Sequence, residues 1–161
     1  QVVLPISIEE IDDYAFENCG NLKSVSLPGA LKTIGNEAFK GTGLRTIAIP
    51  ESVFWIGNGV VADCQLLEHV TIPSNMDKIP EHMFEGCINL KKVELHERLN
   101  EIGERAFFGC SSLDFIVIPD SVKKIGKNAF TNTDKQFIMQ CSFGSYAEEY
   151  ARKNKFKYQL V

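Results

Sequence analysis

Apolar residues recur along the chain with a period of 23 residues. Each copy opens on an isoleucine, and these residues are Ile11, Ile34, Ile56, Ile79, Ile102 and Ile125. The single step of 22, from Ile34 to Ile56, coincides with segment 42–44, which is one residue shorter than its equivalent 19–22. A period of this length indicates stacked repeats, each too small to bury its own apolar face.

Each copy ends in a stretch that predicts a short β-strand. Leu22, Val25 and Leu27 are expected to point inward and Ser24 outward. Pro28 ends the strand because proline has no amide hydrogen for a ladder. Strands from successive copies, stacked in parallel about 4.8 Å apart, would form one continuous core.

The remainder of a copy predicts a second apolar step, at Leu31 and Ile34, and a single helical turn in segment 35–41. The residue after the leading isoleucine is most often glycine, but one copy has Pro80, which cannot adopt a positive φ. We therefore expect this position to require a small residue, or Pro80 to mark a local departure.

The pattern predicts one domain over residues 1–161, in three parts. Residues 1–10 are a partial repeat, 11–141 are repeats, and 142–161 are a C-terminal cap. In the cap, Ser145 and Glu148 form a capping box before a predicted helix, and residues 156–160 alternate as a strand does. Because the chain opens halfway through a repeat, we expect it to be a fragment of a longer protein.

The repeat unit I-G-x-x-A-F-x-G-C-x-x-L-x-x-I-x-I-P-x-S-V-x-x, matched almost completely by residues 102–124, resembles the BspA-like leucine-rich repeat family. The resemblance implies an α/β leucine-rich repeat solenoid, a right-handed β-α superhelix with short parallel strands on its concave face. It also implies an extracellular or cell-surface location and binding to a host extracellular or bacterial surface protein. The family supplies no catalytic residues or cofactors. Two residues depart from the pattern, Val61 in a phenylalanine column and His96 in a proline column.

Composition agrees with a globular protein and excludes some partners. The chain is 44% hydrophobic and has a formal net charge of −4, so it offers no overall basic character for nucleic acid. It contains no apolar run long enough to insert into a membrane. The sequence does not indicate an oligomeric state.

Four cysteines share one column, Cys19, Cys64, Cys87 and Cys110, whose other members are threonines. A metal or redox ladder is one interpretation of the column. Because threonine substitutes there and stacked side chains run parallel, we expect buried free thiols and no metal site. Cys141 falls in a strand column and is expected in the core.

Three groups of residues are candidates for binding. The outward strand positions include His69, Lys92, Glu94, Phe115, Val117 and Ile138. The last three predict an apolar patch about 10 Å across, which either binds a partner or packs under the cap. His69 and Glu94 could also form an acid–base pair, but no catalytic motif accompanies them, so we expect no enzyme.

The second group is Phe54 and Trp55, whose columns are otherwise polar. Either they are an aromatic hot spot for a partner or a ring fills the volume lost at Val61. The third candidate is Phe108, expected to be partly exposed. Because the outward columns vary between units, the sequence favours a non-catalytic protein-interaction or adhesion module. The alternative is a structural spacer without its own ligand.

Overall fold

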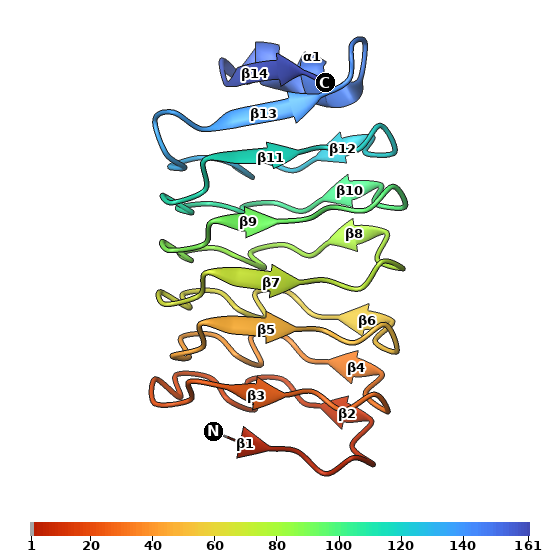
Figure 1. Cartoon of the computed structure of the whole chain (residues 1–161), viewed down its shortest axis with the longest axis vertical. Helices are drawn as coiled ribbons and strands as arrows, with labels where there is room; N and C mark the ends of the chain where they lie inside the picture. The colour runs from red at the N-terminus through yellow and green to blue at the C-terminus, as the bar shows by residue number, and fades with distance from the viewer. Residues whose placement is uncertain (1) are drawn as a thin grey trace.

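The computed structural model describes residues 2–161 and shows a parallel-strand solenoid whose units stack along one axis (Figure 1). Each complete unit contributes one strand to each of two rows. The first row contains β1 (Val2–Val3), β3 (Val25–Ser26), β5 (Thr46–Ala48), β7 (His69–Thr71), β9 (Lys92–Val93), β11 (Phe115–Val117) and β13 (Ile138–Cys141). The second row contains β2 (Glu10–Ile11), β4 (Thr33–Ile34), β6 (Trp55–Ile56), β8 (Lys78–Ile79), β10 (Glu101–Ile102) and β12 (Lys124–Ile125). We call their solvent sides the first face and the second face.

The predicted register is confirmed by the strand pairing. Glu10 lies beside Thr33 and Thr33 beside Trp55 in parallel pairs, so the step of 22 residues leaves the strands aligned. Most inward residues of both rows are buried, among them Ile47 and Ile116 in the first row and Ile34 and Ile102 in the second, whereas Val25 and Ile56 are half-buried. The shorter turn at 42–44 therefore absorbs the missing residue without shifting a side chain to the wrong face.

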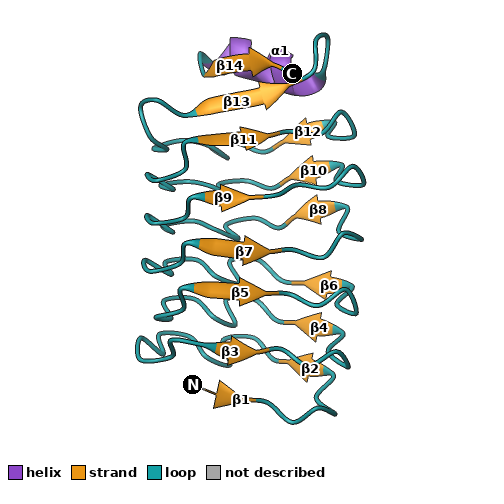
Figure 2. Cartoon of the chain, viewed as in Figure 1, coloured by secondary structure: helices purple, strands orange, loops and turns teal. Residues whose placement is uncertain are grey.

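The expected helical turn in each unit is not confirmed. Segments such as 35–41 are successive turns, and among the described residues the only helix is α1 (Tyr146–Asn154) (Figure 2). Within that segment Glu37 has φ 51° and Gly41 has φ 66°. Such left-handed residues cannot continue a right-handed helix. The architecture is thus mostly strand, and the β-α superhelix implied by the resemblance is replaced by strands and turns.

The glycines after the leading isoleucines pack against the preceding unit. A Cβ on Gly35 would lie 2.3 Å from the backbone nitrogen of Asp13, and one on Gly126 would lie 2.4 Å from that of Glu104. None of these glycines has a positive φ. The prediction that this column needs a small residue is confirmed, and the cause is contact between backbones.

Stacked phenylalanines form the axis of the core. Phe84 and Phe107, and then Phe107 and Phe130, stack with ring centroids 5.1 Å apart. Phe16 and Phe39 stack at 5.2 Å at the N-terminal end. The stack is interrupted at Val61, where the neighbouring alanine column instead carries Val60 and Met83, both fully buried. Val60 lies in the unit that lacks a ring and Met83 in the next unit, and both are larger than the alanine found in this column elsewhere.

Buried thiols connect successive units. The Sγ atoms of Cys64, Cys87 and Cys110 donate to the carbonyl oxygens of Phe39, Val61 and Phe84, at 3.1, 3.0 and 3.2 Å. In the same column the hydroxyl of Thr42 donates to the oxygen of Phe39 at 2.8 Å. The buried members of this column are therefore small side chains that donate a hydrogen bond. The expectation of buried free thiols is confirmed for these three and for Cys141, but it is wrong for Cys19, which is exposed in the structure of residues 2–161.

Both strand rows are interrupted. In the first row no pairing joins β3 to β5 or β9 to β11 within residues 2–161, and in the second row none joins β6 to β8. At β6 and β8 the cause is Pro80. The equivalent glycines donate to the preceding isoleucine, as Gly57 does to Ile34 at 2.9 Å and Gly103 to Ile79 at 2.8 Å. Pro80 has no amide hydrogen, so it is the local departure that the sequence suggested.

The last residues form a helix and a strand. Ser145 is the N-cap of α1 and accepts from the amide of Glu148 at 3.2 Å, while the Glu148 carboxylate accepts from the amide of Gly144 at 2.7 Å. The helix ends at Lys155, with φ 61°. Strand β14 (Lys157–Leu160) then pairs in parallel with β13, and α1 packs against both strands.

Candidate binding surfaces

The first face brings six of the predicted residues together. His69 lies beside Lys92, and Phe115 lies beside Ile138, in adjacent strands of the first row. Phe115 is 41% exposed and Val117 is 46% exposed, although their neighbour Ile116 is buried. Strand alternation thus holds two large apolar side chains in solvent.

Two hollows open on this face, one at the interruption between β9 and β11 and one beside the paired strands β7 and β9. One, of about 380 Å³, is lined by Lys92, Glu94, His96, Phe115 and Val117, among others. The second, of about 230 Å³, adds His69 and Thr71 and shares Lys92, Glu94 and His96 with the first. Together they form a shallow surface that is apolar at β11 and charged at β9.

The polar groups of this surface are paired with each other and do not form an acid–base pair. The Lys92 ammonium donates to the Glu94 carboxylate at 2.7 Å, and this hydrogen bond lowers the pKa of Glu94. His69 therefore lacks the carboxylate partner that the sequence suggested. His96, which replaces a proline, instead places its Nε2 3.3 Å from the carbonyl oxygen of Ile72.

The C-terminal residues do not cover the apolar patch. Strand β14 extends the sheet at its edge, with Lys157 beside Ile138, instead of folding over β11. Ile138 is half-buried, and Phe115 and Val117 stay exposed. The packing explanation is therefore wrong for Phe115 and Val117, which are free to meet a partner.

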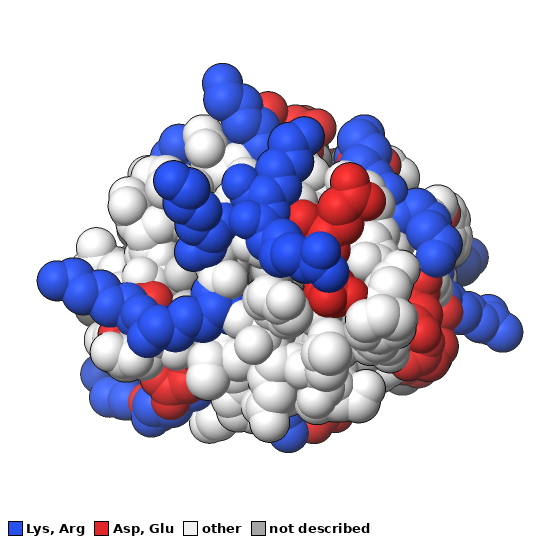
Figure 3. Space-filling model, turned by 90° about the horizontal axis from the view of Figure 1, so that it is seen from above, with Lys and Arg blue, Asp and Glu red and all other residues white. Residues whose placement is uncertain are grey.

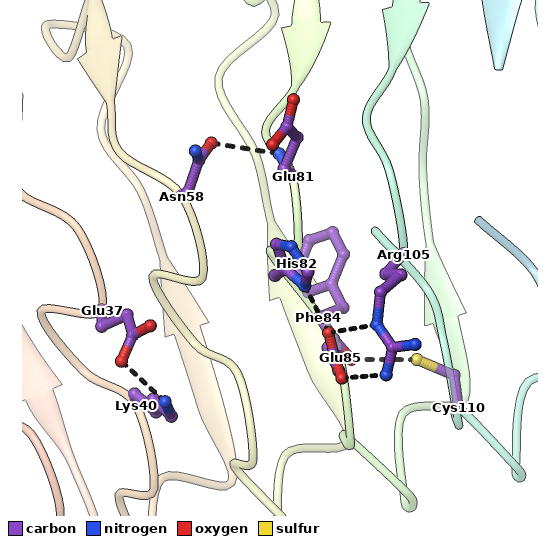
Figure 4. A network of polar contacts seen from close by, with 9 residues as sticks. All are labelled: Glu37, Lys40, Asn58, Glu81, His82, Phe84, Glu85, Arg105 and Cys110. Carbon is purple, nitrogen blue, oxygen red and sulfur yellow. Dashed lines mark hydrogen bonds and ion pairs between the residues drawn. The ribbon is translucent and has the colours of Figure 1, made fainter. Parts of the chain in front are cut away.

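Phe108 lies apart from this surface and is half-buried. The Arg105 guanidinium stacks 3.6 Å above its ring. Arg105 also donates to both carboxylate oxygens of Glu85, whose Oε2 contacts Nδ1 of His82 (Figure 4). The Arg105 hydrogen bond is the main cause of a lowered Glu85 pKa. Phe108 thus supports an ion-pair network.

Phe54 and Trp55 lie on the second face and are 72% and 48% exposed. Neither ring occupies the core beside Val61, so the compensation explanation is wrong. A hollow of about 360 Å³ is lined by both rings, with Met76, Lys78 and Pro80 on its other side. It coincides with the interruption between β6 and β8, a relationship that sequence columns alone do not reveal.

The C-terminal end carries a local positive charge that the net charge of −4 conceals. Arg152, Lys153, Lys155 and Lys157 lie in or after the last turn of α1. Seen along the axis from this end, Lys and Arg cover much of the upper half of the view, with Asp and Glu among them (Figure 3). Within residues 2–161 no helix is long and apolar enough to cross a membrane, and no group of three potential ligands is arranged for a metal ion.

A stacked parallel-strand solenoid with a buried repeat motif defines a leucine-rich repeat protein. The family model for the BspA type leucine rich repeat region matches residues 2–137 in six copies. The chain therefore belongs to the BspA type leucine-rich repeat family, as its repeat pattern suggested. No curated protein sequence matches it.

Solved structures agree with this assignment. A leucine-rich repeat protein from Bacteroides ovatus is similar over 98% of this chain and 44% of its own, with 30% identity and a TM-score of 0.80. One from Eubacterium ventriosum is similar over 81% of this chain and 42% of its own, with 27% identity and a TM-score of 0.68. This chain thus spans less than half of either relative.

A third structure has the same fold at lower identity. It is a leucine rich cell surface protein from Faecalibacterium prausnitzii, with 23% identity, a TM-score of 0.56, and coverage of 92% of this chain and 61% of its own. Membership of the family indicates a protein-interaction or surface module. The ligand is not defined by these similarities.

Proposed function

We propose that this chain is a non-catalytic binding module of an extracellular or cell-surface protein, and that it binds a protein partner through the first face. The supporting observation is the surface at the interruption between β9 and β11. There Phe115 and Val117 remain exposed beside the Lys92–Glu94 ion pair. Exposed apolar side chains rimmed by polar groups are typical of interaction sites.

The variation between units supports a binding role over a spacer role. The inward columns repeat the same residue types, whereas the first face changes from Thr46 and Ala48 on β5 to Phe115 and Val117 on β11. A spacer needs only the scaffold columns, so its outward columns have no reason to differ. Host matrix proteins and bacterial surface proteins are the partners to test first.

The test is a pull-down against host matrix proteins and intact bacteria with native protein, Phe115→Asp and Ile88→Asp. Ile88 is 42% exposed and matches Phe115 in exposure, but it lies in a turn outside both strand rows. We expect Phe115→Asp to lose capture and Ile88→Asp to retain it. Equal capture by the two variants would contradict binding through the first face. No capture by native protein from either source would favour the spacer role.

A further inference from the structure

The interruption between β6 and β8 leaves backbone groups of the second row without their usual partners. One unit earlier, the amides of Phe54 and Trp55 both point to the carbonyl oxygen of Lys32, at 3.0 and 3.4 Å. One unit later, Asn100 donates in the same way to Asp77 at 2.7 Å. Among residues 2–161 no equivalent bond reaches the oxygen of Phe54 or of Ile56. Such groups are costly unless another molecule or water satisfies them.

Apolar side chains lie around these backbone groups, of which Phe54 and Trp55 are exposed, Met76 is half-buried and Pro80 is buried. The hollow of about 360 Å³ has Phe54 and Trp55 on the β6 side and Met76 and Pro80 on the β8 side. Its one cationic side chain, Lys78, is engaged at 3.0 Å by Glu101. The hollow thus combines an apolar lining with free hydrogen-bonding groups, as sites that bind extended peptides by main-chain contacts do.

Carboxylates lie on the other side of the Trp55 ring. A second hollow of about 350 Å³ is lined by Trp55 together with Glu10, Asp12 and Asp13, and no Lys or Arg lines it. Asp13 accepts from Asn36, whereas no ion pair within residues 2–161 involves Glu10 or Asp12. The nearby cation Lys32 is held by Glu9 at 2.9 Å. Negative charge here therefore has no partner of its own.

Strand register places the tryptophan and a carboxylate on one side of the second row. Glu10, Thr33 and Trp55 occupy equivalent positions in β2, β4 and β6. Glu10 and Trp55 are thus about 10 Å apart at the backbone, separated by the shorter side chain of Thr33. A guanidinium laid over Thr33 would contact the face of Trp55 and the carboxylate of Glu10 together, which is favourable geometry for both a cation–π contact and an ion pair.

We propose that this groove on the second face is a second binding site, which takes an extended peptide carrying an arginine or lysine side chain. The peptide main chain occupies the interruption between β6 and β8, and its cation lies on the other side of Trp55. Carbohydrate is the other ligand that binds on aromatic surfaces, but a neutral sugar leaves the carboxylates of Glu10 and Asp12 unused. The site is on the opposite row from Phe115 and is independent of the first-face proposal.

The chain offers a direct measurement, because Trp55 is its only tryptophan. The probe is a blocked octapeptide that alternates arginine with valine, and its control replaces each arginine by the neutral isostere citrulline. We expect the arginine peptide to change Trp55 emission in a saturable way. We expect the citrulline peptide to bind at least about fivefold more weakly, because it loses the cation contacts. Equal binding of both peptides, or a saturable response to chito-oligosaccharides without one to the arginine peptide, would overturn the proposal.

Two variants test the two halves of the groove. Pro80→Gly restores the residue that four other units contain, so it should fold and close the ladder. It should weaken binding of the arginine peptide at least about fivefold. The double variant Glu10→Gln with Asp12→Asn should weaken binding by at least the same factor. Ile88→Ala, in a turn outside both strand rows, is the matched control and should bind as the native protein does. Native affinity in either groove variant would show that its half of the groove makes no contact with the peptide, which contradicts the proposal.

Discussion

The thiol of Cys110 donates a hydrogen bond to the carbonyl oxygen of Phe84, 3.2 Å away in the preceding unit. Equivalent bonds between units are made by Cys64 and Cys87, whereas the hydroxyl of Thr42 donates to Phe39 within its own unit. The Thr42 hydroxyl also lies 3.2 Å from the thiol of Cys64 in the next unit. The buried cysteines of this column therefore connect units by hydrogen bonds, and the column holds small side chains that can donate.

The thiols should respond to pH in a defined direction. Burial raises the pKa of Cys110 from its ordinary value of 9.0 to about 12. The protonated folded form keeps its full stability below pH 9, and stability is lost between pH 9 and about 12 as the unfolded chain ionises first. We expect urea titrations to show this loss, at about 1.4 kcal/mol per pH unit per buried thiol. Cys110→Thr should show a shallower fall, and a parallel fall would contradict the burial of this thiol.

Thiol accessibility gives a second prediction. Cys19 is exposed and the other four cysteines are buried. Ellman's reagent at neutral pH should therefore label one thiol of the folded protein rapidly and all five only after unfolding. Cys19→Ser should abolish the rapid phase. Rapid labelling of two or more thiols would indicate that the units open more readily than the buried core suggests.

Truncation of a core ring should be strongly destabilising. Phe84 is fully buried and stacks on Phe107. Phe84→Ala should lower the free energy of unfolding by about 3–5 kcal/mol, from lost burial and the cavity left behind. Phe115→Ala is the comparison, since its ring is exposed, and it should change stability by less than about 0.5 kcal/mol. Similar losses in both variants, measured by chemical denaturation, would place Phe84 outside the core.

The interrupted ring stack predicts a coupled set of substitutions. Because Val60 and, in the next unit, Met83 are larger than the alanine of the other units and fully buried, we expect Val61→Phe alone to overpack the core and cost about 1–3 kcal/mol. Combining Val61→Phe with Val60→Ala and Met83→Ala restores the pattern of the other units and should recover most of that loss. Additive destabilisation in the triple variant would mean that these side chains do not share one volume.

The carboxylate at the centre of the Arg105 network should contribute to stability only when ionised. The pKa of Glu85 is lowered from 4.5, chiefly by the hydrogen bond from Arg105. Its contribution is therefore present above pH 4.5 and lost as pH falls through the lowered value. Glu85→Gln should cost about 1 kcal/mol at pH 7, a modest value because the network is partly exposed. The difference from native protein should vanish at low pH, and a constant difference would mean that charge is not its source.

The repeat columns predicted much of the fold and less of the surfaces. Spacing alone identified the parallel register and the inward residues, because every unit must present the same apolar set to its neighbours. Column reasoning was wrong for Cys19, which is exposed in the structure of residues 2–161. The explanation that Phe54 or Trp55 fills the volume missing at Val61 was wrong, because both side chains are exposed, whereas Val60 and Met83 in the adjacent column are larger than alanine and buried. Such exchanges depend on three-dimensional neighbours and cannot be read from one column.

The predicted helical turn of each unit was not found, for a related reason. Ala38 and Phe39 are compatible with a helix, but the left-handed residue Glu37 precedes them, and its amide donates to Asn58 of the next unit at 2.8 Å. The hollows were not predicted from the sequence either, although Pro80 was identified there as a possible local departure. Two of them lie where a ladder is interrupted, and that depends on bonds that are missing between two units.

These interruptions never occupy the same step on both rows. Where β6 and β8 are unpaired, β5 and β7 are paired, and where β9 and β11 are unpaired, β10 and β12 are paired. Where β3 and β5 are unpaired, β4 and β6 are paired. At each of these steps a force along the axis is therefore resisted by at least one intact hydrogen-bond ladder. The protein can open a groove on one side of a unit and still transmit tension through the other.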